Sequence, residues 1–260
     1  MLVIDASMSR ITRPVFAQFR DELGIKTFIQ CLWTGGYAQN EDIRRVAAPN
    51  LADAFDEGYE IAGYTNVSPW YEVAMSLFET KRNAGVMWDH LSLIPIDLEL
   101  AGIQPQAVKE TITRLDKPTL IYTGLWWWNP WIATHDFDFS DQRGWIAFYD
   151  NDPDRDVHQV ERLGKIIGEQ YKGSTTQFGV DVDFSFFERI EEWPMPDTSE
   201  ILLRLEKLEH ILFVNGLSLD TRIWQSAGSH DRALMPLVWN SRKRLPKEVV
   251  LEWYPNWNGK

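Results

Sequence analysis

Short apolar runs alternate with longer segments of helical spacing through the first half of the chain. This alternation constrains the fold more than any other feature of the sequence. A strand, a crossover helix and a second parallel strand form the repeating unit of α/β folds. The chain has 260 residues, a length at which an α/β barrel forms a single domain.

Eight strands are expected from the apolar and β-branched runs. They cover residues 2–4, 26–32, 59–65, 91–99, 119–123, 145–149, 165–171 and 178–183. Five helices are expected, over residues 14–23, 50–57 (with Asn50 as N-cap), 70–83, 105–115 and 157–163. Only the last of these lies among the later strands. The sequence therefore predicts a TIM-like (β/α) barrel with an irregular second half, of the (β/α)5(β)3 type.

A proline-punctuated stretch, Trp193-Pro194-Met195-Pro196, marks a boundary because neither a helix nor a strand continues easily through it. We expect the barrel to span 1–193 and a C-terminal extension of helix and strands to span 194–260. Within the extension, an apolar seam at helical spacing is formed by Ile201, Leu205, Leu208 and Leu212. This seam fits a helix that packs on its own barrel or one that forms an oligomer.

The charge and cysteine content exclude several classes of function. The formal net charge is −12, which argues against binding nucleic acid, since that needs clustered Lys and Arg. The lone Cys31 cannot form an intrachain disulfide, and no Cys/His cluster suits zinc. The sequence begins without a secretory signal pattern and has no apolar run long enough to span a bilayer. We therefore expect delivery by another component if the protein acts outside the cell.

Acidic residues stand at the ends of three expected strands. Asp5 ends the first strand, Asp97 and Glu99 end the fourth, and Asp181 and Asp183 end the last. The carboxyl ends of barrel strands form the open face on which active sites lie. Residues two apart on a strand share a face, so Asp97 and Glu99 can enter one cavity. Repulsion within such a group raises at least one carboxyl pKa, which prepares a general acid.

Two other interpretations of these acids remain open. They could be solvated or could cap the helices that follow. Alternatively, Asp5, Asp97, Glu99 and Asp181 could hold magnesium or calcium, whose preferred ligands are oxygen atoms. No histidine lies beside them, which disfavours zinc or iron. We expect no metal and no other cofactor.

Several short motifs follow one another along residues 1–190. They are Ile4-Asp5-Ala6-Ser7, the stretch from Asn50 to Gly58 with Gly63-Tyr64, Asp97-Leu98-Glu99, Ile121-Tyr122-Thr123, Gln170-Tyr171 and Val180-Asp181-Val182-Asp183. Their order and spacing resemble glycoside hydrolase family 25, the Chalaropsis-type lysozymes. The chain departs from that family after its second strand, where Cys31-Leu32-Trp33-Thr34-Gly35-Gly36 lacks the family's acid, and at Tyr64-Thr65, where the family has Tyr-His.

The resemblance implies a muramidase that hydrolyses the β-1,4 bond between N-acetylmuramic acid and N-acetylglucosamine in peptidoglycan. It implies that Glu99 is the general acid and that Asp97 stabilises the transition state or orients the substrate's acetamido group. Asp5 and Asp181 would position the sugar or keep Asp97 ionised. Such a protein acts at the bacterial cell wall, as a phage endolysin or a virion-associated lysin, delivered by the phage or released from the cytoplasm.

The sequence is rich in tryptophan, with 13 Trp against 8 Tyr, and several tryptophans follow the expected strands. Aromatic faces suit the apolar faces of sugar rings, although most large aromatic residues pack in cores. The expected substrate-binding residues are Tyr64, Tyr122, Trp126, Trp128, Trp33, Gln170 and Asp183. A competing interpretation is a barrel that binds glycan without cleaving it, in a phage tail or secretion apparatus. The extension would then contact that apparatus or a second copy of the chain.

Overall fold

The computed structural model describes residues 1–154 and 156–188, except for the side chain of Tyr37. Eight strands close into a barrel in sequence order. They are β1 (Leu2–Ala6), β2 (Thr27–Trp33), β3 (Glu60–Asn66), β4 (Ile94–Asp97), β5 (Thr119–Gly124), β6 (Gly144–Ala147), β7 (Ile166–Gln177) and β8 (Val180–Phe187). Strands β1 to β7 run parallel, whereas β8 is antiparallel to both β7 and β1. The expected (β/α)5(β)3 barrel is confirmed.

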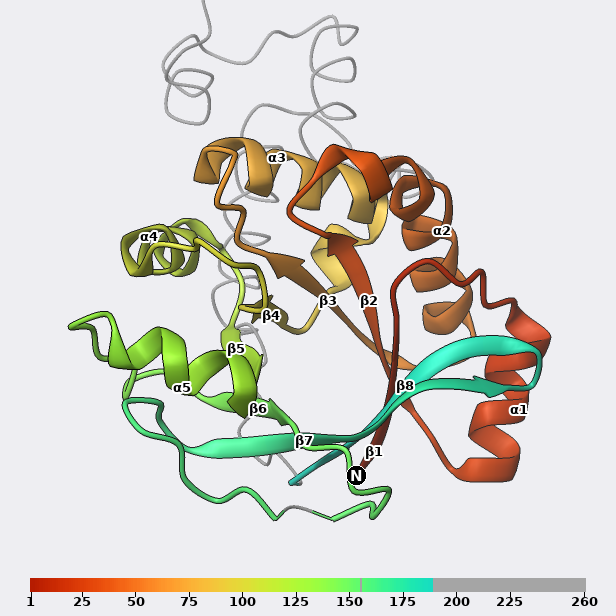
Figure 1. Cartoon of the computed structure of the whole chain (residues 1–260). Coiled ribbons are helices and arrows are strands. Elements are labelled where there is room, and N and C mark those ends of the chain that lie inside the picture. The colour runs from red at the N-terminus through yellow and green to blue at the C-terminus, as the bar shows by residue number, and fades with distance from the viewer. Residues whose placement is uncertain (155, 189–260) are drawn as a thin grey trace, which may run out of the picture. The chain divides into compact units, whose positions relative to one another are not determined.

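Five α-helices follow the first five strands. They are α1 (Arg13–Leu23), α2 (Tyr37–Asp56), α3 (Val73–Ala84), α4 (Pro105–Arg114) and α5 (Leu125–Ala133), and a 3-10 helix, η1 (Gly85–His90), follows α3. Figure 1 shows α1 to α5 on the outside of β1 to β5, while no helix of the described residues covers β6 to β8. None of the described helices is long and apolar enough to cross a membrane.

Helix α2 is longer than expected and contains Pro49 in its interior. The expectation that Asn50 caps this helix is therefore wrong. The Asn50 side chain is buried and donates to the Ser9 carbonyl and to Gln30 Oε1, both at 2.8 Å. It also accepts the backbone N–H of Ile11 at 2.9 Å. Asn50 thus fixes the loop after β1 to the neighbouring strand, a tertiary role that a local capping pattern does not reveal.

The other disagreement concerns residues after β5. Residues 157–163 form no helix, and Leu163 instead makes an isolated bridge with Phe139. The tryptophan-rich stretch Leu125–Ala133 is helical, with Trp128 and Trp131 buried against the core. Burial of two large aromatic surfaces on one side of α5 outweighs the poor helical signal of a segment that contains Pro130.

Strand alternation sorts side chains between the barrel interior and the layer under the helices. The interior cluster includes Val3 from β1, Leu93 directly before β4, Leu120 from β5 and Phe187 from β8. Within a strand, residues that are separated by an even number of positions point to the same side of the sheet. The apolar interior therefore continues, toward the carboxyl ends of β1, β4 and β5, into the polar residues described below.

Strands β7 and β8 form a hairpin around Phe178 and Gly179, whose φ angles are 51° and 78°. Two residues with positive φ match the right-handed twist of a tight hairpin. The register pairs Thr176 with Asp181 near the turn and Asp5 with Asp183 at the barrel. The hairpin register, which the sequence does not reveal, thus decides which aspartate faces the interior.

The expected C-terminal extension, 194–260, lies outside the described residues, and so do the seam from Ile201 to Leu212 and the domain boundary at Pro194. The division into a barrel and an extension remains a prediction.

Candidate active site

Four carboxyl side chains converge at one end of the barrel. Asp5 comes from β1, Asp97 ends β4, Glu99 follows it, and Asp183 comes from β8. Asp5 and Asp97 are buried, while Glu99 and Asp183 are half-buried. The two less buried acids are therefore the ones that a ligand at the mouth could reach first.

Gln170 on β7 connects this group to two tyrosines. Its side-chain amide donates to Asp5 Oδ2 at 3.1 Å and to Asp183 Oδ2 at 3.4 Å. Its carbonyl oxygen accepts the hydroxyls of Tyr122 at 2.6 Å and Tyr149 at 2.8 Å. Both N–H groups and both lone pairs of the amide are thereby used. Gln170 was expected to bind substrate, and the structure shows that its amide group is bonded to four side chains of the protein.

Burial raises the pKa of the acids. Loss of solvent, followed by repulsion from Glu99, raises the pKa of Asp97 to about 8, although the Asn66 side chain and the Glu99 N–H donate to it. Burial also raises the pKa of Glu99, against a hydrogen bond from the Gly124 N–H. In both cases burial shifts the pKa in the direction that a proton donor needs.

The pKa values of the other two acids, Asp5 and Asp183, are raised as well. Burial first, then the charges of Asp183 and Asp97, raises the pKa of Asp5 well above its ordinary value. Burial raises the pKa of Asp183, although the backbone N–H of Ser174 donates to its carboxylate. Four acids in one buried group cannot all ionise at neutral pH without large repulsion.

Asp181 was expected to belong to this group, and the structure does not place it there. Its exposed carboxylate accepts the Thr176 hydroxyl at 2.6 Å, near the tip of the β7–β8 hairpin. Asp183, expected only to bind substrate, occupies the place next to Asp5 instead. The physical reason is the β7–β8 hairpin. Strand β8 begins at the hairpin turn, beyond the barrel, and its pairing with β1 starts at Asp183, two residues after Asp181.

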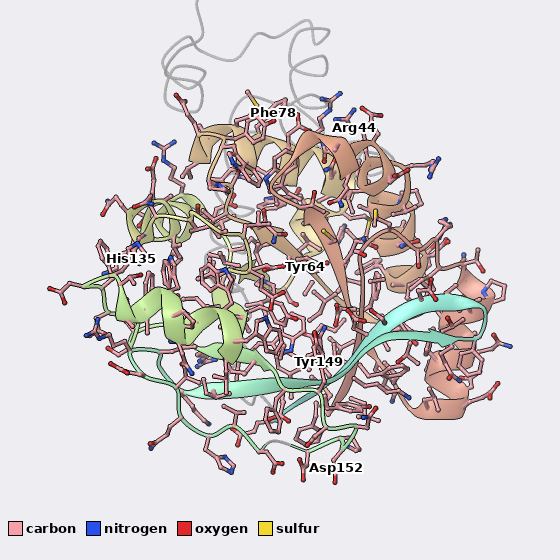
Figure 2. All side chains as sticks on the ribbon, in the orientation of Figure 1. Arg44, Tyr64, Phe78, His135, Tyr149 and Asp152 are labelled. Atoms are coloured by element: carbon pink, nitrogen blue, oxygen red, sulfur yellow. The ribbon has the colours of Figure 1, made fainter. Side chains whose placement is uncertain are left out.

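Two tyrosines expected at the site do line it. Tyr122 is buried on the interior face of β5, and Tyr64 on β3 is half-buried. Burial raises the pKa of Tyr64, and the neighbouring Cys31, Asp5 and Asp97 raise it further. In Figure 2, Tyr64 and Tyr149 lie over the central part of the barrel, while Phe78 and His135 lie at its periphery.

An exposed aromatic pair borders the acids. Trp126, 57% exposed, and Tyr149, 52% exposed, have ring centroids 5.7 Å apart with an interplanar angle of 33°. Gly124 makes this arrangement possible, because a Cβ at that position would lie 2.3 Å from the Trp126 ring. Through its hydroxyl, Tyr149 also reaches Gln170, so the aromatic pair is connected to the acids.

Two other expected sugar platforms are core residues. Trp33 is fully buried, with its ring edge-on to Tyr71 at 6.1 Å. Trp128 is fully buried and donates its indole N–H to the Glu161 carbonyl at 2.9 Å. Neither ring offers a face to a ligand. The sequence places tryptophans after strands but does not determine which of them α5 turns inward.

Two residues of the site escaped the sequence analysis. Tyr149 ends an expected strand but extends beyond β6 into the mouth. Asn66 ends β3 and donates to Asp97. A polar residue at the end of a strand beside the strand of Asp97 was an available signal for Asn66, since strand ends meet at one face.

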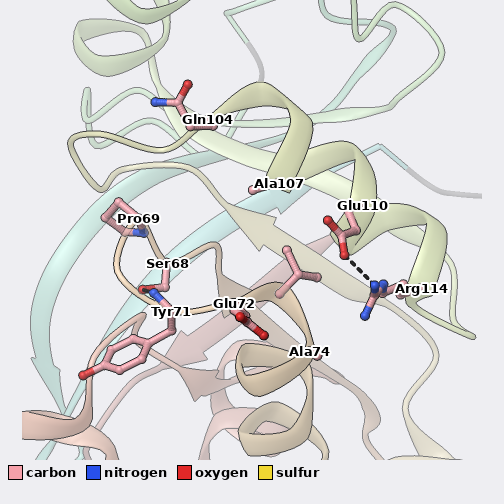
Figure 3. A pocket seen from close by; sticks show the side chains of 10 residues that line it. Ser68, Pro69, Tyr71, Glu72, Ala74, Gln104, Ala107, Glu110 and Arg114 are labelled. Atoms are coloured by element: carbon pink, nitrogen blue, oxygen red, sulfur yellow. Dashed lines mark hydrogen bonds and ion pairs between the residues drawn. The ribbon is translucent and has the colours of Figure 1, made fainter.

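A separate cavity of about 390 Å³ lies between the loop after β3, the start of α3 and α4 (Figure 3). None of the four acids lines it. Its wall includes the ion pair of Glu110 and Arg114 at 2.7 Å. Ser68 at its rim donates to the Gly35 carbonyl and accepts the N–H groups of Trp70 and Tyr71, so it orders the loop.

No protein-family model and no curated protein matches the sequence. Solved structures do share the fold. The muramidase from Acremonium alcalophilum superposes with a TM-score of 0.54 and 16% identity, over 74% of this chain and 95% of that one. The family GH25 lysozyme from Aspergillus fumigatus gives 0.51 and 15%, over 77% and 99%. The CTP1L endolysin gives 0.52 and 15%, over 72% of this chain and 66% of the endolysin. The described part of the chain therefore has the barrel fold of these lysozymes.

Proposed function

We propose that the protein is a glycoside hydrolase of the muramidase type, which cleaves the β-1,4 bond between N-acetylmuramic acid and N-acetylglucosamine in peptidoglycan. One observation carries the proposal: Asp5, Asp97, Glu99 and Asp183 gather in the mouth of a barrel whose fold is that of known lysozymes. Glycoside hydrolysis requires a protonated carboxyl group beside a second carboxyl group.

Glu99 is the proton donor of the proposed reaction. It follows β4 at the mouth, is less buried than Asp97, and has a raised pKa. It would give its proton to the glycosidic oxygen as the bond from the anomeric carbon breaks, and water would add to that carbon to complete hydrolysis.

Asp97 orients the substrate. Because its pKa is raised to about 8, it keeps a proton at neutral pH in the free protein. A neutral carboxyl group can accept the acetamido N–H and donate to the acetamido oxygen. This favours the orienting role over charge stabilisation. Asp5 and Asp183, which are bridged by Gln170, would bind the side of the sugar that faces away from Asp97.

The exposed ring of Trp126 supplies a surface for a sugar ring, and Tyr149 keeps it in place. Stacking on an indole leaves the sugar hydroxyls free to bond to the polar residues of the mouth.

We also propose that the protein reaches the cell wall through another component, as a phage-delivered or released lysin. The charge of −12 supports this, since it gives no general attraction to an anionic envelope. Residues 194–260 would contact that component or a second copy of the chain. The molar mass of the full chain in solution tests the second possibility, because a monomer excludes contact with a second copy.

The activity is tested by clearing of purified bacterial cell walls. Glu99→Gln keeps the shape of the side chain and removes the proton donor, so the rate should fall roughly a hundredfold or more. Glu22→Gln, an exposed change on α1, should clear walls like wild type. A Glu99→Gln variant that releases reducing sugar at the wild-type rate would refute the assignment.

A further inference from the structure

The cavity between α3 and α4 is built by the same two strand ends that carry part of the acidic site. Its first wall begins at Ser68, in the loop that follows Asn66 at the end of β3. Its second wall begins at Gln104, in the segment that follows Glu99 after β4. The carboxyl ends of parallel barrel strands meet at one face. A ligand that extends from the mouth over the loops after β3 and β4 therefore meets this cavity.

The loop wall of the cavity is ordered by the protein's own contacts. The Ser68 hydroxyl donates to the Gly35 carbonyl at 2.8 Å and accepts the backbone N–H groups of Trp70 at 3.1 Å and Tyr71 at 3.2 Å. The Tyr71 ring packs edge-on against the fully buried Trp33 at 6.1 Å. A wall that is already ordered adds little entropic cost when a ligand binds.

Side chains of both charges line the cavity. Figure 3 shows Glu110 and Arg114 on the α4 wall and Glu72 on the opposite wall, at the start of α3. Arg114 donates to Glu110 at 2.7 Å, and its guanidinium keeps further N–H donors for a ligand. Glu72 is exposed, and its carboxylate forms no ion pair within the described residues. The cavity thus offers a donor for a carboxylate and an acceptor for an amino group.

The rest of the lining is small and largely apolar. Pro69, Val73, Ala74 and Ala107 separate the charged side chains, and the volume is about 390 Å³. Sites for small ligands have volumes of about 300–1,000 Å³ and combine an apolar lining with a few polar groups. The cavity therefore suits a short segment that carries charges of both signs.

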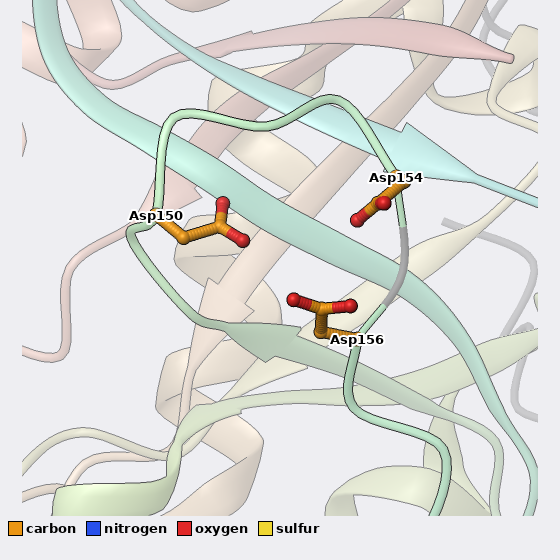
Figure 4. A group of neighbouring side chains, drawn as sticks. All are labelled: Asp150, Asp154 and Asp156. Carbon is orange, nitrogen blue, oxygen red and sulfur yellow. The ribbon is translucent and has the colours of Figure 1, made fainter.

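The loop after β6, at the same end of the barrel, has a different character. Asp150, Asp154 and Asp156 are exposed there, each with one carboxylate oxygen within 4.8 Å of the others (Figure 4). Such a group repels the carboxylate of a ligand, whereas Arg114 attracts it. A ligand with carboxylates is therefore directed to the side of β3 and β4.

We propose that the cavity between α3 and α4 binds the peptide stem of peptidoglycan, beside the glycan strand held in the mouth. The inference rests on the proposed function. In peptidoglycan, N-acetylmuramic acid carries a short peptide with carboxylate groups and a side-chain amino group. Arg114 binds a carboxylate of this peptide, Glu72 binds its amino group, and Gln104 bonds to its amides. A neutral sugar would leave both charges unused, and a polyanion would be repelled by Glu72 and Glu110.

Calorimetric titration of the full chain with Glu99→Gln tests the site, because this variant should bind glycan without cleaving it. The probes are a soluble peptidoglycan tetrasaccharide with its tetrapeptide stems and the same tetrasaccharide after an amidase has removed the stems. The stem-bearing fragment should bind roughly tenfold more tightly, the effect of one charge-assisted hydrogen bond. Adding Arg114→Gln or Glu72→Gln should remove most of this difference and leave the Kd of the bare fragment unchanged.

Arg45→Gln is the matched control. Like Arg114, Arg45 forms an exposed ion pair within one helix, with Asp42 at 2.8 Å on α2, and it does not line the cavity. This variant should keep the full difference between the two fragments. Equal affinity for both fragments in the Glu99→Gln chain would overturn the proposal. So would Arg114→Gln that keeps the difference or that weakens the binding of both fragments equally.

Clearing of cell walls by the wild-type chain, measured in parallel, tests the proposed function separately. A chain that clears walls but binds both fragments equally refutes the stem site alone. A chain that binds the stem-bearing fragment through Arg114 but does not clear walls supports the stem site and refutes the cleavage.

Discussion

Asp5 and Asp183 face each other as paired residues of the antiparallel ladder between β1 and β8, and one side-chain amide, that of Gln170, donates to both. The first strand and the last strand of the barrel therefore meet at a pair of acids. Burial raises the pKa of both carboxyl groups, and the charge of Asp183 raises that of Asp5 further, so the pair retains protons more readily than isolated carboxyl groups do.

Separate substitutions of Asp183 and Asp181 distinguish the roles of the two aspartates of β8. Asp183→Asn should lower the rate of cell-wall clearing roughly tenfold to a hundredfold, because a carboxyl group facing the substrate is lost. Asp181→Asn, two residues away at the exposed hairpin end, should stay within about twofold of wild type. Equal losses in both variants would show that the hairpin as a whole, and not the Asp183 carboxylate, supports activity.

Gln170→Glu should destabilise the fold, and the loss of stability should grow as the pH rises and the new carboxyl group ionises. The new side chain can still accept from Tyr122 and Tyr149, but it places a third acid against Asp5 and Asp183. An ionised buried acid without a cationic partner should lower the free energy of unfolding by about 3 kcal/mol. Urea unfolding measures the change, with the exposed Gln159→Glu as a control of equal charge.

The raised pKa values predict that stability falls as pH rises. Asp97 has a folded-state pKa of about 8 against an ordinary value of 3.8, so the folded state binds more protons than the unfolded state between these values. This contribution is fully present below about pH 4 and is lost by about pH 8. Asp97→Asn should reduce the slope of unfolding free energy by up to about 1.4 kcal/mol per pH unit in this window. A wild-type slope in that variant would contradict the burial of an acid at position 97.

Trp126 should contribute to glycan binding. In a Glu99→Gln background, Trp126→Ala should raise the Kd for a peptidoglycan fragment roughly tenfold, the loss expected for one stacking contact. Phe78→Ala is a suitable control, since Phe78 is 58% exposed on α3 and Trp126 is 57% exposed at the mouth. Calorimetric titration of both variants distinguishes a sugar platform from general surface hydrophobicity.

Trp128 should behave as a core residue. Trp128→Ala removes a fully buried ring and its bond to the Glu161 carbonyl, so the free energy of unfolding should fall by about 3–5 kcal/mol. Trp126→Ala should change it by about 0.5 kcal/mol or less. A stable Trp128→Ala protein with weakened glycan binding would reverse the roles given to the two tryptophans.

The sequence by itself determined the barrel and the acids that follow its early strands. Local alternation of apolar residues and the position of Asp5, Asp97 and Glu99 at strand ends are properties of short segments, which is why they are visible without a structure. Tyr64 and Tyr122 were found for the same reason, since each lies within a well-defined strand.

Only the tertiary structure decided the rest. The choice of Asp183 over Asp181 depends on the register of β8 against β1, because a pairing shift decides which residues reach the barrel mouth. The burial of Trp33 and Trp128 depends on how β2 and α5 pack, and the bonds of Gln170 join strands that are distant in sequence. These features arise from contacts between separate segments, whose geometry no local pattern specifies.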